Sequence, residues 1–115
     1  MELKVFYELV GGDAEKVLDR LPSESMVRRF LGKFPADPSY TDLKASLAQR
    51  EIETAFRAAH TLKGTAGTLG LDTLAAAASA LTEALRGADA MPPQALVEAV
   101  DAAYQTAIEQ IGRLA

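Results

Sequence analysis

The chain has 115 residues, no cysteine, one histidine and a formal net charge of −4. This composition excludes a disulfide framework, a thiolate nucleophile and, within one chain, a zinc–thiolate or multi-histidine metal site. The acidic balance argues against nucleic acid and against an anionic membrane surface as the main partner, because both attract clustered positive charge.

The length predicts one domain over residues 1–115. The N-terminal residues MELKVFYELVGGD contain no long apolar run and no cleavage pattern, and no stretch is apolar and long enough to cross a bilayer. We therefore expect a cytoplasmic protein.

Four short helices are predicted before residue 50. Their apolar residues recur at spacings of three and four, and no strand-like alternation competes with this pattern. The boundaries are set by residues that cap or break helices: Gly11-Gly12, Asp13, Pro22, Ser23 or Ser25, Asp37 as a cap, and Pro38 at the first position of the fourth helix. The apolar residues of these helices, grouped on their inner faces, are Val5, Phe6, Leu9, Val10, Val17, Leu18, Leu21, Met26, Val27, Phe30, Leu31, Phe34, Tyr40, Leu43 and Leu47.

Three longer helices are predicted over about 51–69, 72–86 and 92–114, with Gly70 and Gly87 as C-terminal stops and Pro92-Pro93 as the last start. The alanine-rich run at 75–79 predicts a close contact between helices. The stripes of the last two helices are Leu71, Leu74, Ala78, Leu81 and Leu85, then Leu96, Val100, Tyr104, Ala107, Ile111 and Leu114. Long amphipathic helices joined by short loops predict an all-α fold, an antiparallel four-helix bundle with short additional N-terminal helices.

The helix expected over 51–69 separates into three faces at about 100° per residue. An apolar stripe is expected to face the core: Ile52, Ala55, Phe56, Ala59, Leu62, Ala66 and Leu69. The opposite side carries Glu53, Arg57, Thr61 and Thr68. The flank between them carries His60, Lys63, Gly64 and Gly67, which predicts an imidazole that is supported at its base and exposed at its edge.

The two glycines inside this helix need a physical reason, because each costs about 1 kcal/mol relative to alanine. Gly64 and Gly67 remove side chains next to His60, and so open a shallow notch through which a bulky partner can reach the ring. Two structural alternatives stay open: a lone histidine is most often a solvated or hydrogen-bonded structural residue, and helical glycines often allow a neighbouring helix to pack closely. A nucleotide loop is disfavoured, because a P-loop needs a lysine after the last glycine and a preceding strand.

The residues His60-Thr61-Leu62-Lys63-Gly64, followed by small residues and Leu69-Gly70, resemble the H-x-L-K-G-x-x-x-x-φ-G signature of histidine phosphotransfer (HPt) domains. The upstream FLGKF and EIETAFRAAH segments and the downstream LTEALR segment are also similar to that family. The resemblance extends from about Gly12 to Arg86. It implies a helical bundle and an intermediate of a two-component phosphorelay.

Carried over by position, the resemblance makes His60 the phosphoacceptor, Lys63 the residue that neutralises the phosphoryl oxygens, and Gly64 the point of access for the partner. It implies response-regulator receiver domains as partners, together with a sensor histidine kinase as a further candidate. The Mg²⁺ ion belongs to the receiver, so this chain is expected to need no cofactor and to turn over no substrate as an enzyme. A monomer is expected because a carrier must dock two partners in turn. The partner is expected to contact Glu53, Arg57, Thr61, Gly64, Gly67 and Thr68.

One position departs from the family pattern. Many members place Gln or Glu on the next helix to hydrogen-bond the histidine or its phosphoryl group, whereas this chain has Thr82 at the aligned position and Glu83 one residue later. Either residue is a candidate for supporting the histidine. The AGTLG segment also resembles phosphotransfer domains of chemotaxis histidine kinases, but the acidic residue and second histidine typical of those domains are missing. The other alternative is a bundle that binds partners as a scaffold without chemistry. A hydrolase or transferase with its own active site is disfavoured, because the sequence has no clustered carboxylates beside His60 and no nucleophile–base pair.

Overall fold

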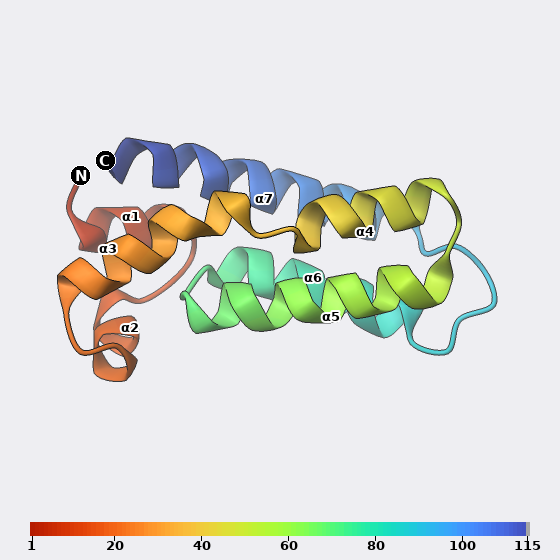
Figure 1. The fold of residues 1–115 in the computed structure, drawn as a ribbon, viewed down its shortest axis with the longest axis horizontal. Coiled ribbons are helices and arrows are strands. Elements are labelled where there is room, and N and C mark those ends of the chain that lie inside the picture. The colour runs from red at the N-terminus through yellow and green to blue at the C-terminus, as the bar shows by residue number, and fades with distance from the viewer. Residues whose placement is uncertain (115) are drawn as a thin grey trace.

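Seven α-helices and one 3-10 turn follow one another along residues 1–114, the part of the chain that the computed structural model describes (Figure 1). They are α1 (Leu3–Leu9), α2 (Ala14–Arg20), α3 (Glu24–Lys33), the 3-10 turn η1 (Phe34–Ala36), α4 (Ser39–Ala48), α5 (Ile52–Thr68), α6 (Asp72–Leu85) and α7 (Gln94–Leu114). No strand occurs in this part of the chain. The predicted all-α fold class is therefore confirmed.

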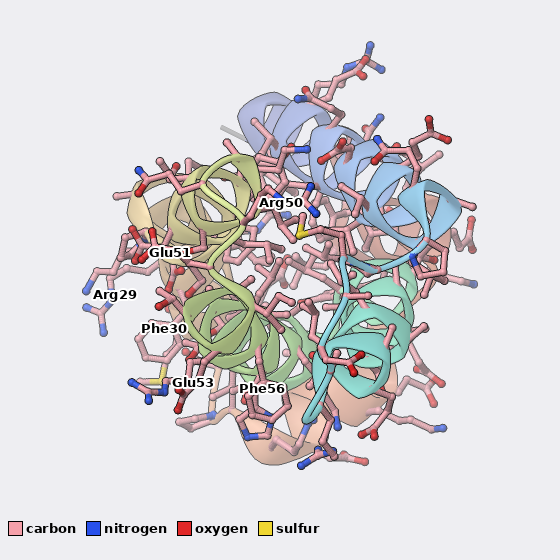
Figure 2. The ribbon with its side chains drawn as sticks, turned by 90° about the vertical axis from the view of Figure 1, so that its right-hand side faces the viewer. Arg29, Phe30, Arg50, Glu51, Glu53 and Phe56 are labelled. Carbon is pink, nitrogen blue, oxygen red and sulfur yellow. The ribbon has the colours of Figure 1, made fainter. Side chains whose placement is uncertain are left out.

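The four C-terminal helices form an antiparallel bundle. In the view along the long axis, α4, α5, α6 and α7 occupy the four corners in chain order (Figure 2). Helices α3 and α4 run one after the other along the same side of the molecule, interrupted by η1, and α1 and α2 lie at the end where the α5–α6 turn is found (Figure 1). Helix α5 packs most extensively against α6 and next against α4.

Side-chain caps and left-handed residues set several of the helix ends. Asp13 accepts hydrogen bonds from the first turn of α2, and Ser23 accepts one from the Met26 amide at the start of α3. Asp37 Oδ1 accepts a hydrogen bond from the Ser39 amide at 2.8 Å, and α4 begins at Ser39, one residue later than predicted. Gly70 and Gly87 have φ of +76° and +60° at the ends of α5 and α6, as expected for C-terminal stops.

The short N-terminal helices were only partly predicted. Val5, Leu9 and Leu18 were grouped with the inward-facing residues but are exposed by 39 to 48% of their surface, whereas Leu3 and Tyr7 are buried in the core. Helices α1 and α2 have seven residues each. With two turns, the apolar residues of such a helix fit more than one face, so spacing alone does not select the buried one.

The N-terminal helices are joined to the end of α5 by a tightly packed contact. The Tyr7 hydroxyl donates a hydrogen bond to the Leu69 carbonyl at 2.7 Å, and burial raises the pKa of Tyr7 to about 12, against a smaller opposing effect of Arg20. A Cβ atom at Gly12 would collide with the Gly70 carbonyl oxygen and lie 2.8 Å from the Tyr7 ring. Glycine is therefore required here by the close approach of two backbone segments.

A polar and aromatic cluster joins α4 to α7. The rings of Tyr40 and Tyr104 are stacked, with centroids 3.7 Å apart, and the Tyr40 hydroxyl donates to Asp101 at 2.7 Å. The Lys44 ammonium lies 2.9 Å from both oxygens of the same carboxylate. Partial burial tends to raise the pKa of Asp101, but the hydrogen bonds from Lys44 and Tyr40 outweigh it and lower this pKa below its ordinary value.

Stability should therefore depend on the ionisation of Asp101. Because the pKa of Asp101 is lower in the folded chain than in the unfolded chain, its contribution is present above the ordinary value of about 3.9 and is lost as the pH falls through the folded value. Asp101→Asn is expected to destabilise the fold by about 1 kcal/mol at neutral pH and to flatten the loss of stability on acidification. Thermal melts between about pH 3 and pH 7 test this; parallel pH profiles for the two proteins would contradict it.

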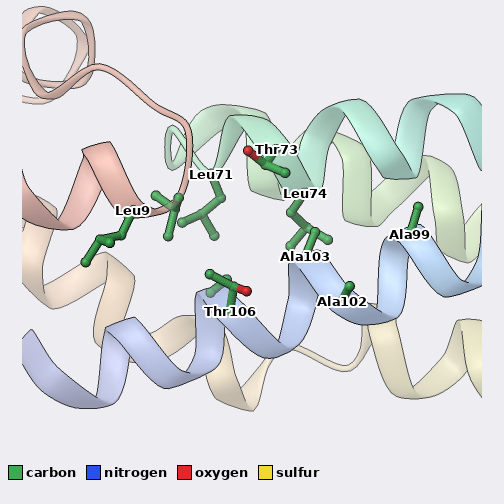
Figure 3. Close-up of a pocket in the computed structure, with 10 residues that line it drawn as sticks. Leu9, Leu71, Thr73, Leu74, Ala99, Ala102, Ala103 and Thr106 are labelled. Atoms are coloured by element: carbon green, nitrogen blue, oxygen red, sulfur yellow. The ribbon is translucent and has the colours of Figure 1, made fainter.

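A shallow apolar groove lies between α1, α6 and α7 (Figure 3). It has a volume of about 260 Å³ and is lined mainly by leucines, alanines and threonines, among them Leu9, Leu74, Ala99, Ala103 and Thr106. None of the predicted site residues lines it. Over residues 1–114, no helix combines the length and apolar character that crossing a membrane requires.

Candidate functional site

Helix α5 presents His60 on its exposed side. The predicted core positions Ala55, Ala59, Leu62, Ala66 and Leu69 are buried, while Ile52 and Phe56 are half-buried against the core. The imidazole is exposed, and Lys63, one turn later on the same flank, is half-buried. The Lys63 ammonium takes part in none of the ion pairs formed within residues 1–114.

The helix surface next to His60 is open at both glycines. A Cβ atom added to Gly64 or to Gly67 would meet no atom within 4 Å outside its own stretch of helix. Close packing of a neighbouring helix therefore does not explain these glycines. What they remove is bulk on the solvent side, as the sequence predicted.

On one side of His60, a groove separates α5 from α3 and η1. It is lined by Phe30, Lys33, Phe34, Asp37, Thr61, Gly64, Thr65, Thr68 and Leu69, with a volume of about 560 Å³. Figure 2 shows Phe30 at the outer edge of the bundle, beside Arg29. The guanidinium of Arg29 and the ammonium of Lys33 lie 5.9 and 6.0 Å from the Phe30 ring centroid. The groove thus combines an aromatic wall with two residues of opposite charge, Lys33 and Asp37.

On the other side of His60, aromatic and charged groups of α5 and α6 come together. The Phe56 ring lies 6.2 Å from the imidazole, centroid to centroid, and the two planes are within 11° of parallel. The Arg86 guanidinium lies 5.0 Å from the Phe56 centroid. The Glu83 carboxylate binds that guanidinium through two hydrogen bonds, at 3.1 and 3.2 Å. Phe56 projects from the outer edge of α5 in Figure 2.

The charges around Glu83 favour its ionised form. The hydrogen bond and charge of Arg86 lower the pKa of Glu83, and the charges of Lys63 and His60 make smaller contributions in the same direction. Its carboxylate is therefore in the electrostatic field of the predicted site.

The two residues considered as support for the histidine lie in different environments. Thr82 is fully buried, and its hydroxyl donates to the Ala78 carbonyl of its own helix at 2.6 Å, which uses the one proton that a threonine side chain can donate. Glu83 is exposed, and the charge of His60 makes a small contribution to lowering its pKa. Of the two, Glu83 is the one whose charge reaches the imidazole.

The remaining predicted contact residues lie on the exposed surface of α5. Glu53, Arg57, Thr61 and Thr68 are all exposed, and Glu53 and Arg57 form an ion pair one turn apart. Arg20 of α2 reaches the same helix, donating a hydrogen bond to the Gly67 carbonyl at 3.4 Å. Within residues 1–114, no group of three or more histidine or acidic side chains is placed to hold a metal ion.

Three residues around the site were not predicted as site residues: Phe30 and Phe56 had been assigned to the core, and Arg86 to a helix end. Phe56 lies one turn before His60, so its place beside the imidazole follows from helical spacing. The position of Arg86 depends on the register between α5 and α6 on either side of the Gly70 turn. No local sequence motif predicts this register.

Comparison with known families agrees with this arrangement. The model of the Hpt domain family matches residues 25–112, from the start of α3 to near the end of α7. The matched region thus includes His60 and the last helix, and it leaves out α1 and α2. No significant match was found among curated proteins or among solved structures. The family consists of phosphocarrier modules of two-component signalling, and this chain belongs to it.

Proposed function

We propose that this chain is a histidine phosphotransfer protein, in which His60 accepts a phosphoryl group from the aspartate of one receiver domain and passes it to another. The observation that carries the proposal is an exposed imidazole beside Lys63, on a stretch of helix that Gly64 and Gly67 leave bare. A phosphocarrier must be reached by the active site of its partner, and this flank offers that access.

The transfer requires little chemistry from the carrier. The lone pair of a neutral imidazole nitrogen attacks the phosphorus of the aspartyl phosphate, an N–P bond forms and the P–O bond breaks. The receiver aspartate leaves as a carboxylate with the electron pair of the broken bond, while the imidazole keeps the proton on its other nitrogen. The same reaction in the opposite direction then transfers the phosphoryl group from His60 to the aspartate of a second receiver. The Mg²⁺ ion of this chemistry is supplied by the receiver.

Lys63 is proposed to neutralise the phosphoryl oxygens. We expect Lys63→Ala to keep the fold, with a change in stability within about 0.5 kcal/mol, and to slow phosphotransfer about five- to tenfold, as expected for the loss of one charge-assisted hydrogen bond. Lys63→Arg should keep most of the rate. The measurement is the initial rate of label transfer from a phosphorylated receiver. Equal rates for Lys63→Ala and the unmodified chain would show that Lys63 is only a solvated charge.

Gly64 is proposed to give the receiver its access to the ring. Gly64→Leu should stabilise the helix by about 0.5–1 kcal/mol, because leucine is the better helix former, and should abolish receiver binding because its side chain fills the notch. Gly112→Leu is a matched control, since Gly112 is also a helical glycine with open space around it, on α7. Thermal melts and binding titrations against a receiver separate the two effects. A Gly64→Leu chain that binds normally would contradict the proposed route of approach.

The proposal is tested by phosphotransfer profiling. The chain is incubated with each phosphorylated receiver domain encoded by the same genome, and acid-labile label on the chain is followed with time. The proposal predicts rapid labelling by a subset of receivers. A scaffold that binds without chemistry predicts receiver binding but no labelling, and this result would replace the proposal.

A further inference from the structure

The geometry points to a charge switch on the α6 side of His60: we propose that Arg86, held by Glu83 and by the Phe56 ring in the unphosphorylated chain, transfers its guanidinium to the phosphoryl group once His60 carries one. This inference rests on the proposed function and adds a second cation and a competing carboxylate to the same site. In this proposal Arg86 binds the phosphoryl group, and Glu83 binds Arg86 while His60 is unphosphorylated.

The antiparallel register of α5 and α6 brings these groups together. Arg86 lies over the Phe56 ring. Because α5 and α6 run in opposite directions, His60, one turn after Phe56 on α5, lies level with residues 82 and 83, one turn before Arg86 on α6. Thr82 is buried at that level. Glu83 is therefore the α6 side chain that faces the imidazole from outside the core.

The Phe56 ring places the guanidinium within reach of the site. The ring centroid lies 5.0 Å from the Arg86 guanidinium and 6.2 Å from the imidazole centroid, so these separations together set an upper limit on the distance from Arg86 to His60. Arginine carries its charge at the end of a long flexible chain and binds phosphoryl oxygens with two parallel hydrogen bonds. A modest change of side-chain conformation then suffices to reach a phosphoryl group on the ring.

Charge decides which anion Arg86 binds. The side chains of Glu83 and Arg86 are 59% and 56% exposed, so solvent screens this ion pair and makes it weak. A phosphoryl group carries about two negative charges near neutral pH, against one on a carboxylate, and it offers three acceptor oxygens. The phosphoryl group therefore outcompetes Glu83 for Arg86, and its repulsion of the Glu83 carboxylate acts in the same direction.

The equilibrium of phosphoryl exchange with a receiver tests the switch. Arg86→Ala should move this equilibrium about tenfold toward the phosphorylated receiver, because the carrier loses one strong hydrogen-bonding cation. Arg86→Lys should recover part of the shift, and Glu83→Gln should move the equilibrium the opposite way, by about threefold or more, because a repelling charge is gone. Arg113→Ala is the matched control, since Arg113 forms a similarly exposed pair with Glu109 on α7. An Arg86→Ala equilibrium equal to that of the control would overturn the inference.

A second measurement does not depend on any receiver. Phosphoramidate transfers its phosphoryl group to an imidazole nitrogen, and ammonia leaves. The NMR signal of the Arg86 Nε–H group should move when His60 is phosphorylated in this way, while that of Arg113 should not. If the Arg86 signal stays in place on a chain with phosphorylated His60, the switch is wrong even though the phosphocarrier function stands. If the Arg86 signal moves but no receiver transfers label, the proposed function is wrong and the switch stands.

Discussion

Replacing His60 with glutamine is expected to abolish phosphoryl uptake by the chain completely. Glutamine is similar in length but has no nucleophilic nitrogen, so no N–P bond can form. The side chain is exposed, and the fold should therefore keep its stability within about 0.5 kcal/mol. The measurement is the amount of acid-labile label on the variant after incubation with a phosphorylated receiver, with thermal melts and receiver binding as controls for folding.

This variant also separates the two functions considered for the bundle. A phosphocarrier loses its output with His60→Gln while still docking its receiver, because Gly64, Gly67 and the groove beside Phe30 are unchanged. A scaffold keeps both binding and output. Label that persists at the level of the unmodified chain would place the phosphoacceptor elsewhere and would contradict the role given to His60.

Gly70→Ala is expected to cause a large loss of stability. Gly70 has φ of +76°, and a Cβ atom there would press on Val17 and lie 2.8 Å from the Tyr7 ring. The left-handed backbone and the overpacked contact together should cost about 2–5 kcal/mol. Chemical unfolding of the variant measures this cost directly.

The same substitution in an open position gives the control. Gly32 lies within α3, and a Cβ atom there would meet nothing within 4 Å, so Gly32→Ala should stabilise the chain by about 0.5–1 kcal/mol. If Gly70→Ala is instead neutral, the packing of α1 and α2 against the end of α5 is looser than the structure indicates. In a Val17→Ala background the cost of Gly70→Ala should be smaller, because part of the collision is removed.

Local sequence signals predicted the long helices because each signal acts within a few residues. Ser23 caps α3, Asp37 accepts a hydrogen bond from the first amide of α4, Gly70 and Gly87 end helices in the left-handed conformation, and every apolar position predicted for α6 is buried. The α4–α5 turn was less predictable. Arg50 adopts φ of +58° there, a position that glycine usually occupies, and nothing in the identity of an arginine indicates it.

The candidate site also has features that local sequence predicted and features that it did not predict. His60, Lys63, Gly64 and Gly67 belong to one helix, so their shared flank followed from helical geometry and the motif. The Arg86–Phe56 contact and the groove next to Phe30 join different elements. They depend on the register and distance between packed helices, which are properties of the tertiary structure. Thr82 is an example: the sequence aligns it with the family position that supports the histidine, but does not show that its hydroxyl donates a hydrogen bond within its own helix.

The most direct test of the account is to locate the phosphoryl group on the chain after transfer from a receiver. The chain is labelled by a phosphorylated receiver, digested under non-acidic conditions and analysed by tandem mass spectrometry, and a second portion is mixed with an unphosphorylated receiver. The account predicts one phosphoryl group on an imidazole nitrogen of His60 that then moves to the receiver aspartate. A phosphoryl group on any other residue, or one that no receiver can remove, would contradict it.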